Sequence, residues 1–345
     1  MIIRFKKGAT MKQFIALTFM LSLLFLTGCG SDYDDEGTLI PTEPISDLEV
    51  ELVVTSVEFN GVLYPLENDI IPEPEGVDIN LRTADYSEAE LFTLASNEPT
   101  IGVLSNINVG RAFTEGEIYK VLTPYYREIV GPNGDTMGKV VTMLDSNIMT
   151  PKDLEGKRVG IQGEADGSSI AFMTALKKIY QVDLDTIEFI AVESNMAPLM
   201  LQEGNLDASM FDSDYIITEG FSESYKVVID FNREMYDFYG TVPPASFFVV
   251  KKEFYDEDPA LYNRIIDYFT ENYQWYKDNV EEVSQLEADA SGDSYETIRL
   301  KADYEERAGK VTEKDIGAFY GFYEIAKERG VIDFIPDLNE LFITP

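Results

Sequence analysis

Histidine is absent from the 345-residue chain, and cysteine occurs once, at Cys29. Without histidine, neither a Ser/His/Asp nor a Cys/His arrangement is available to activate a nucleophile. A single cysteine likewise excludes a disulfide within the chain and a CxxC site. Metal binding is left to carboxylates, which suit hard cations rather than zinc. We therefore expect no metal, no cofactor and binding rather than catalysis, although carboxylates alone can serve as acid and base.

Basic residues are also scarce, with 27 Lys and Arg against 63 Asp and Glu and a net charge of -36. Outside the first 28 residues, no basic cluster is larger than a pair. Because phosphate contacts need basic patches, we expect no nucleic-acid partner. The hydrophobic fraction of 45% is nevertheless large enough for a buried core, and the length allows two domains.

The N-terminus resembles a bacterial or archaeal lipoprotein signal. Residues 1–28 contain basic side chains and no acids, and the apolar run 14–26 is shorter than a membrane-spanning helix and leads to Leu-Thr-Gly-Cys29. The resemblance implies cleavage before Cys29, lipidation of its thiol and an extracytoplasmic protein anchored to the cell membrane. An uncleaved anchor helix and a secretory signal with an incidental cysteine are the alternatives. The acidic, proline-bearing residues 29–46 are interpreted as a tether.

From residue 49 onward, short β-rich runs alternate with helical patterns, which predicts α/β units with parallel sheets. The predicted strands are residues 49–57, 77–83, 100–104, 119–122, 139–144, 158–162, 187–192, 206–211, 225–229 and 246–251. The predicted helices are residues 87–96, 168–180, 195–203, 259–283, 294–307 and 312–329.

The middle of the chain resembles a known family. Residues 149–161 (MTPKDLEGKRVGI) are similar to the "L.DLKGK.VGV" entry into the second lobe of type II periplasmic binding proteins. A glycine-bearing turn at 163–169, the segment 198–204 (PLMLQEG) and residues 205–208 (NLDA) follow in the family's order. Together, over about residues 100–255, they resemble the nitrate, sulfonate and thiamine-precursor branch of ABC-transporter substrate-binding proteins.

The resemblance implies an α/β fold of two Rossmann-like lobes joined by a two-strand hinge, with a ligand held between the lobes. Residues 47–145 would begin lobe I, residues 146–244 would form lobe II, and residues 245–345 would complete lobe I. The last three helices would pack on lobe I. The family usually has a clear helix between its first two strands, whereas residues 60–76 contain three prolines and are predicted to be mostly loop.

The glycine-bearing turn 163–169 is the first candidate site. A turn that leaves a strand and opens a helix exposes backbone N–H groups and the positive end of the helix dipole, and Ser168 and Ser169 can donate hydroxyl hydrogen bonds. The alternative is that Ser168 only caps the helix. Glu164 and Asp166 would satisfy the same helix end and repel an anion.

The ends of other strands supply further candidates. Asp212 and Asp214 directly follow the strand 206–211, and carboxyl ends of strands face the ligand in open α/β sheets. The alternatives are a helix cap at Asp212 and a solvated Asp214. On lobe I, Asn106 follows the strand 100–104 and can donate or accept. Tyr236, near the second crossing between lobes, could stack on a planar ligand.

The acids near the expected ligand favour a neutral or amino-bearing solute, such as a small heteroaromatic, over an isolated oxyanion. The resemblance implies a monomeric, lipid-anchored receptor that passes a small molecule to an ABC permease with a separate ATPase. One alternative is a cofactor-free enzyme on the same bilobal fold, with Asp212 or Glu164 as base. The other is a surface sensor whose ligand-bound lobes engage a membrane kinase.

The lipoprotein signal predicts that Cys29→Ser abolishes acylation and prevents formation of the processed, lipid-linked protein. Cleavage by the lipoprotein peptidase and attachment of the lipid both depend on the cysteine thiol. Mass spectrometry of the mature N-terminus measures this directly. A membrane-bound wild-type protein that retains Met1 or Met11 as its first residue would contradict the prediction.

Overall fold

The structure is a computed structural model that describes residues 48–55, 63–84, 93–211, 216, 224–307 and 309–343. The chain divides into two units, Met1–Ser46 and Asp47–Pro345, and all the elements below belong to the second. Cys29, Asp212 and Asp214 lie outside the described residues. Within those ranges, no helix is both long and apolar enough to cross a membrane.

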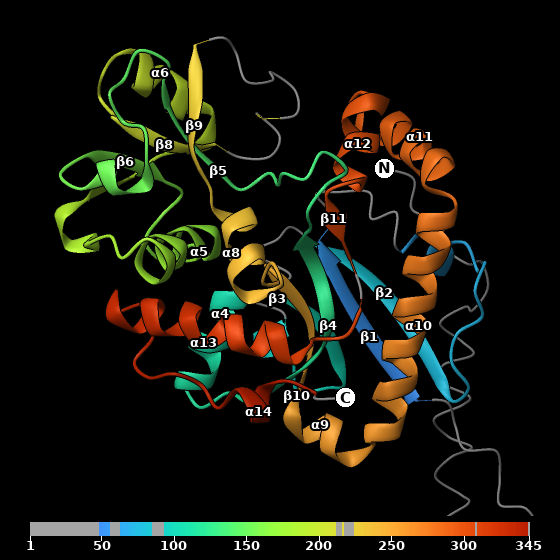
Figure 1. Ribbon diagram of the computed structural model, residues 1–345. Helices are drawn as coiled ribbons and strands as arrows, with labels where there is room; N and C mark the ends of the chain where they lie inside the picture. Colours follow the sequence, from blue (N-terminus) through green and yellow to red (C-terminus); the bar gives the residue numbers. More distant parts are fainter. Residues whose placement is uncertain are drawn as a thin grey trace, which may run out of the picture. The chain divides into compact units, whose positions relative to one another are not determined.

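Two sheets organise the second unit (Figure 1). The first has six strands in the order β11-β4-β10-β3-β1-β2, and we call it and the helices on it lobe I. Strands β1, β2 and β3 run parallel, whereas β10 runs antiparallel to both β3 and β4. Its strands are β1 (Leu48–Thr55), β2 (Val77–Ala84), β3 (Thr100–Ser105), β4 (Tyr119–Glu128), β10 (Ser246–Lys251) and β11 (Glu305–Glu306).

The second sheet has five strands in the order β7-β6-β8-β5-β9 and defines lobe II. Strands β6, β7 and β8 are parallel, and β5 lies antiparallel between β8 and β9. Its strands are β5 (Lys139–Met143), β6 (Arg158–Ile161), β7 (Glu188–Ala191), β8 (Ala208–Phe211) and β9 (Tyr225–Asp230). Every predicted strand overlaps an observed one, and the short β11 is additional.

One predicted boundary is wrong. Ending the first part of lobe I at residue 145 assigned β5 to lobe I, but β5 pairs with β8 and β9 of lobe II. The first crossing between the sheets is therefore residues 129–138, and the return crossing is residues 240–245. Both crossings are irregular segments rather than strands. Parallel pairs occur in both sheets, as predicted, and β5 and β10, which follow the two crossings, run antiparallel to their neighbours.

The helices follow the predicted order with two consequential additions, α4 and α8, each of which begins directly after a strand. The long helix predicted over residues 259–283 is divided at Asn279, and residues 87–92 of the predicted 87–96 helix are not described. The helices are α2 (Tyr64–Glu67), α4 (Asn106–Thr114), α5 (Gly167–Thr174, continued by a π-helical turn at Ala175–Ile179), α6 (Ala197–Gln202), α8 (Phe231–Tyr239), α9 (Lys252–Glu257), α10 (Pro259–Asp278), α11 (Val280–Ser291), α12 (Tyr295–Ala302), α13 (Glu313–Glu328) and α14 (Leu338–Leu341).

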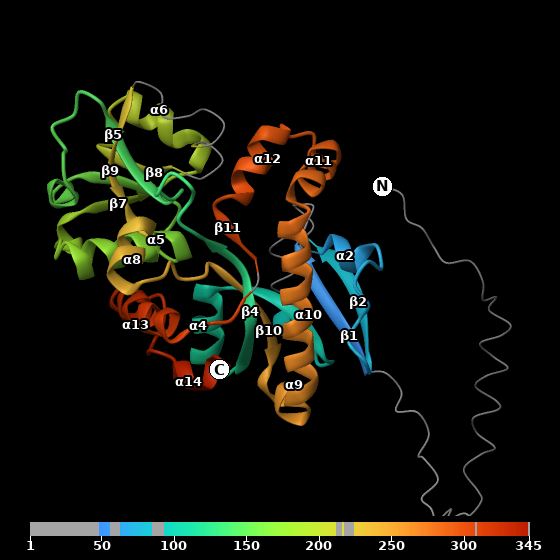
Figure 2. The ribbon, with the colours of Figure 1, turned by 45° about the vertical axis from the view of Figure 1, so that its right-hand side comes forward.

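Helix α13 packs on lobe I, as expected, and also on α5 and α8 of lobe II (Figure 2). Toward lobe I, the Phe319 ring lies 5.6 Å from that of Phe247 on β10. Toward lobe II, Glu328 forms an ion pair with Lys177 at 3.0 Å, and Lys178 pairs with Glu324 at 2.6 Å. The apolar face of this helix extends the core of one lobe to the other.

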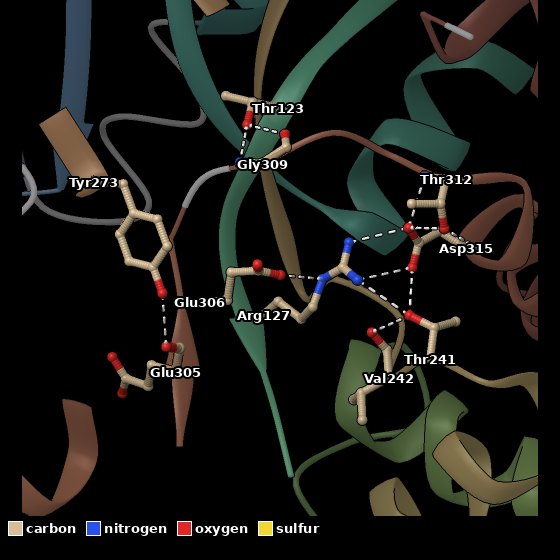
Figure 3. A network of polar contacts seen from close by, with 10 residues as sticks. All are labelled: Thr123, Arg127, Thr241, Val242, Tyr273, Glu305, Glu306, Gly309, Thr312 and Asp315. Carbon is tan, nitrogen blue, oxygen red and sulfur yellow. Dashed lines mark hydrogen bonds and ion pairs between the residues drawn. The ribbon is translucent and has the colours of Figure 1, made fainter. Parts of the chain in front are cut away.

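A buried polar network ties the end of β4 and the return crossing to α13 (Figure 3). Asp315 in the first turn of α13 is fully buried and forms two contacts of 3.1 Å with the guanidinium of Arg127 on β4. Thr241, in the return crossing, donates a hydrogen bond to the same carboxylate at 2.6 Å. The backbone N–H and hydroxyl of Thr312 donate to it at 2.8 Å and complete a capping box.

This network predicts that Asp315→Ala lowers the free energy of unfolding by about 3–5 kcal/mol, because the buried Arg127 loses both of its contacts with Asp315 and keeps only the partly exposed Glu306 as a carboxylate partner. Asp237→Ala is the matched control, since Asp237 is exposed and pairs with Arg233 at 3.0 Å on the surface. We expect the control to lose no more than about 1 kcal/mol. Urea unfolding measures both variants. Equal losses would show that the buried network has no special role.

Candidate ligand-binding site

A cavity of about 210 Å³ lies between the lobes. Its lining residues come from helices and strands of both lobes and from both crossings. Its polar side chains come from Asn106, Tyr126, Glu128, Gln162, Ser168 and Asn232. Apolar walls come from Met137 in the first crossing, from Met210, Phe211 and Phe231 in lobe II and from Val242 and Pro243 in the return crossing. None of the described lining residues is a lysine or an arginine.

Asn106 begins α4 directly after β3, as the sequence predicted for a residue at the end of that strand. Its side chain is buried, and Nδ2 donates to the carbonyl oxygen of Pro244 in the return crossing at 3.0 Å. The hydroxyl of Tyr323 on α13 donates to the Asn106 carbonyl oxygen at 2.8 Å. Among the residues that the structure describes, the side-chain oxygen Oδ1 has no hydrogen-bond partner.

The two predicted serines differ in position. Ser168 lines the cavity, whereas Ser169 is fully buried and its hydroxyl donates to Asp166 and to the sulfur of Met210. The cap of α5 is Asp166 rather than Ser168, because its Oδ1 accepts from the backbone N–H of Ser169 at 2.9 Å. Burial raises the pKa of the Asp166 carboxyl, although the hydrogen bonds from the helix end oppose that shift. The Asp166 carboxylate thus already accepts a hydrogen bond at the positive, N-terminal end of this helix.

Gly167 allows the two lobes to approach each other at the cavity. A Cβ atom at this position would lie 2.4 Å from Oδ1 of Asn106, which is far too close for non-bonded atoms. The N-terminus of α5 in lobe II can therefore lie against the N-terminus of α4 in lobe I only because residue 167 has no side chain. Gly163, in the same turn, has no atom within 4 Å of its would-be Cβ.

Glu128, at the end of β4, is the ionisable cavity residue that the sequence analysis missed. The backbone N–H groups of Met137 and Gly138 donate to its Oε1, the latter at 2.8 Å, and Asn232 Nδ2 donates to its Oε2 at 2.8 Å. Burial raises its pKa to about 7, and Asp230 adds to the shift, while the hydrogen bonds oppose it. The rule that selected Asp212, an acid at the end of a strand, would also have selected Glu128 if β4 had been predicted at its full length.

Tyr236 lies on an exposed part of α8 and does not line the cavity. Its ring centroid is 5.9 Å from the guanidinium carbon of Arg233 on the same helix. Tyr126 on β4 does line the cavity. Phe211, the residue before the undescribed Asp212, lines it as well. In the described part of the chain, no group of three or more acids could hold a metal ion.

Two lobes of mixed α/β structure, crossed twice by the chain and enclosing a cavity, define the fold of type II periplasmic binding proteins, as predicted. The structure is similar to the periplasmic aliphatic sulphonate binding protein SsuA from Escherichia coli, with a TM-score of 0.67, 14% identity and coverage of 85% of this chain and 96% of that chain. It is also similar to the alkanesulfonate-binding SsuA from Xanthomonas axonopodis pv. citri bound to MOPS, with a TM-score of 0.59, 12% identity and coverage of 88% and 100%.

An enzyme is among the similar structures. The desulfurization enzyme DSZB matches with a TM-score of 0.54, 12% identity and coverage of 85% of this chain and 95% of that chain. Such low identities establish the fold alone. Residues 73–283 match the model of the NMT1/THI5 like family, and the chain belongs to that family. No curated protein sequence matches the chain.

Proposed function

We propose that this protein is an extracytoplasmic solute-binding protein that captures a small molecule between its lobes and delivers it to an ABC permease with a separate ATPase. The observation that carries the proposal is the cavity to which both lobes and both crossings contribute side chains. A solute that contacts both lobes would favour the arrangement in which they are closed. Family membership and the similarity to the two sulfonate-binding proteins support the same role.

The anchoring part of the proposal rests on the N-terminal sequence. Cys29 would carry the lipid, and residues 29–46 would connect it to the folded unit. Such an anchor would hold the cavity outside the cytoplasm and beside the membrane, where a permease would receive the solute. We propose that the protein acts there as a monomer.

A cofactor-free enzyme is the second candidate, and Glu128 favours it, because a carboxyl group with a pKa of about 7 is suited to act as a general base. The similarity to DSZB points in the same direction. An enzyme would convert its ligand, whereas a binding protein returns it unchanged. The two candidates therefore differ in what is recovered from the protein.

The test uses native mass spectrometry of protein purified from its own cells, followed by denaturation and analysis of the released small molecules. We expect one solute per chain in the wild type and in Gly163→Ala, because a methyl group at position 163 meets no neighbouring atom. Gly167→Ala should lose most of the solute, because its methyl group would displace Asn106 and separate the lobes.

Three results bear on the proposal in different ways. Absence of any bound molecule in the wild type would contradict solute binding. Equal retention by Gly167→Ala would show that the solute lies elsewhere. Conversion of the released molecule on re-addition to the protein would favour the enzyme.

A further inference from the structure

We propose that the solute presents a positively charged nitrogen to the cavity. Glu128 balances the charge of this nitrogen, and one of its N–H groups donates a hydrogen bond to Oδ1 of Asn106. The inference rests on the proposed function, because it specifies what the same cavity binds. The hydrogen-bonding state of Asn106, the ion pairs around Glu128 and the occupied end of α5 support it.

The orientation of the Asn106 amide is fixed by its surroundings. Its NH₂ group donates to the carbonyl oxygen of Pro244 at 3.0 Å, which only the nitrogen end of the amide can do. The oxygen end then lies against Gly167, at the wall of the cavity. Only 4% of the residue is exposed, and among the described residues this oxygen has no hydrogen-bond donor. A buried acceptor without a partner is costly, so a ligand that supplies a donor gains that free energy.

Glu128 places a negative charge on the cavity wall without a cationic partner among the described residues. The nearby cations are engaged with other acids. Arg127 pairs with Asp315 and Glu306, Lys139 with Asp135 at 2.7 Å, and Arg233 with Asp237 at 3.0 Å. Asp230 on β9 adds further negative potential. A cation from the ligand would therefore complete a charge pair that the protein leaves open.

The opposite assignment, an oxyanion at the N-terminus of α5, is disfavoured by Asp166. This carboxylate already accepts from the first turn of the helix and would repel a second anion. With no lysine or arginine among the described lining residues, an oxyanion would lose its hydration without a compensating charge. The cavity holds about seven water volumes, which suits a molecule built on a single ring.

Three probes that share one ring test the inference: benzamidine, which is a cation, benzamide, which is neutral, and benzenesulfonate, which is an anion. The protein is first freed of its own solute by unfolding and refolding. We expect benzamidine to raise the melting temperature more than benzamide does, and benzenesulfonate to leave it unchanged. Glu128→Gln should weaken benzamidine binding at least about tenfold in calorimetric titrations. Glu117→Gln is the control, because Glu117 is exposed, pairs with Lys251 and lies outside the cavity lining.

The pH dependence provides a second readout that does not require the variant to fold. Benzamidine affinity for the wild type should rise between pH 6 and pH 8, because Glu128, with a pKa of about 7, becomes ionised over that range. Asp166 and Asp230 also border this region, so Glu128→Gln, where folded, should flatten the profile if Glu128 is responsible.

Stronger binding of benzenesulfonate than of benzamidine would overturn the inference and leave solute binding intact. Equal shifts with all three probes, or a benzamidine affinity that does not change from pH 6 to pH 8, would also overturn it. Failure of the proposed function is a separate result, seen as the absence of any released solute in the mass-spectrometric test.

Discussion

The buried carboxylate of Asp315 is the constraint on which the arrangement of the lobes depends. It binds the Arg127 guanidinium with two contacts of 3.1 Å and accepts a hydrogen bond from Thr241 at 2.6 Å. These partners belong to the strand that leads into the first crossing and to the return crossing. A single side chain of α13 therefore holds the strand from which the first crossing starts and the return crossing itself. Burial of these charges is tolerated because each is paired and hydrogen-bonded within the network.

The cavity residues follow directly from this constraint. Glu128 is the residue after Arg127, and Val242 and Pro243 come after Thr241, so fixing the network also fixes three parts of the cavity wall. Tyr323, two turns further along α13, donates to the backbone of Asn106 at 2.8 Å and positions the start of α4. Helix α13 thus acts as a common support for the lobe I side of the site and for both crossings.

Local patterns in the sequence were sufficient for the strands, because β-rich runs bounded by polar or glycine-containing segments reflect burial within a sheet. The same local patterns could not show which of the two sheets a strand joins. Strand β5 has the same composition whether it pairs within lobe I or lobe II, and only its partners β8 and β9 decide the matter. For the same reason, α13 was expected on one lobe and contacts two.

Residues of the candidate site were predictable where they come directly after a strand whose end is clear from the sequence. Asn106 and Ser168 line the cavity as positions at a strand end and a helix start suggested. Glu128 was missed because Pro124 interrupts the β pattern, whereas β4 continues through it with a shift in its register to β10. Tyr236 was chosen for its aromatic ring and its place near the second crossing, and its exposure on α8 depends on packing that the sequence does not report.

The central claim is that the two lobes close on a solute held between them. Small-angle X-ray scattering of the solute-loaded protein, and of the same protein after the solute has been stripped by unfolding and refolding, tests it most directly. The account predicts a smaller radius of gyration for the loaded protein, with the stripped form returning to that value when the released solute is added back. An identical radius in both states at saturating solute would contradict closure between the lobes.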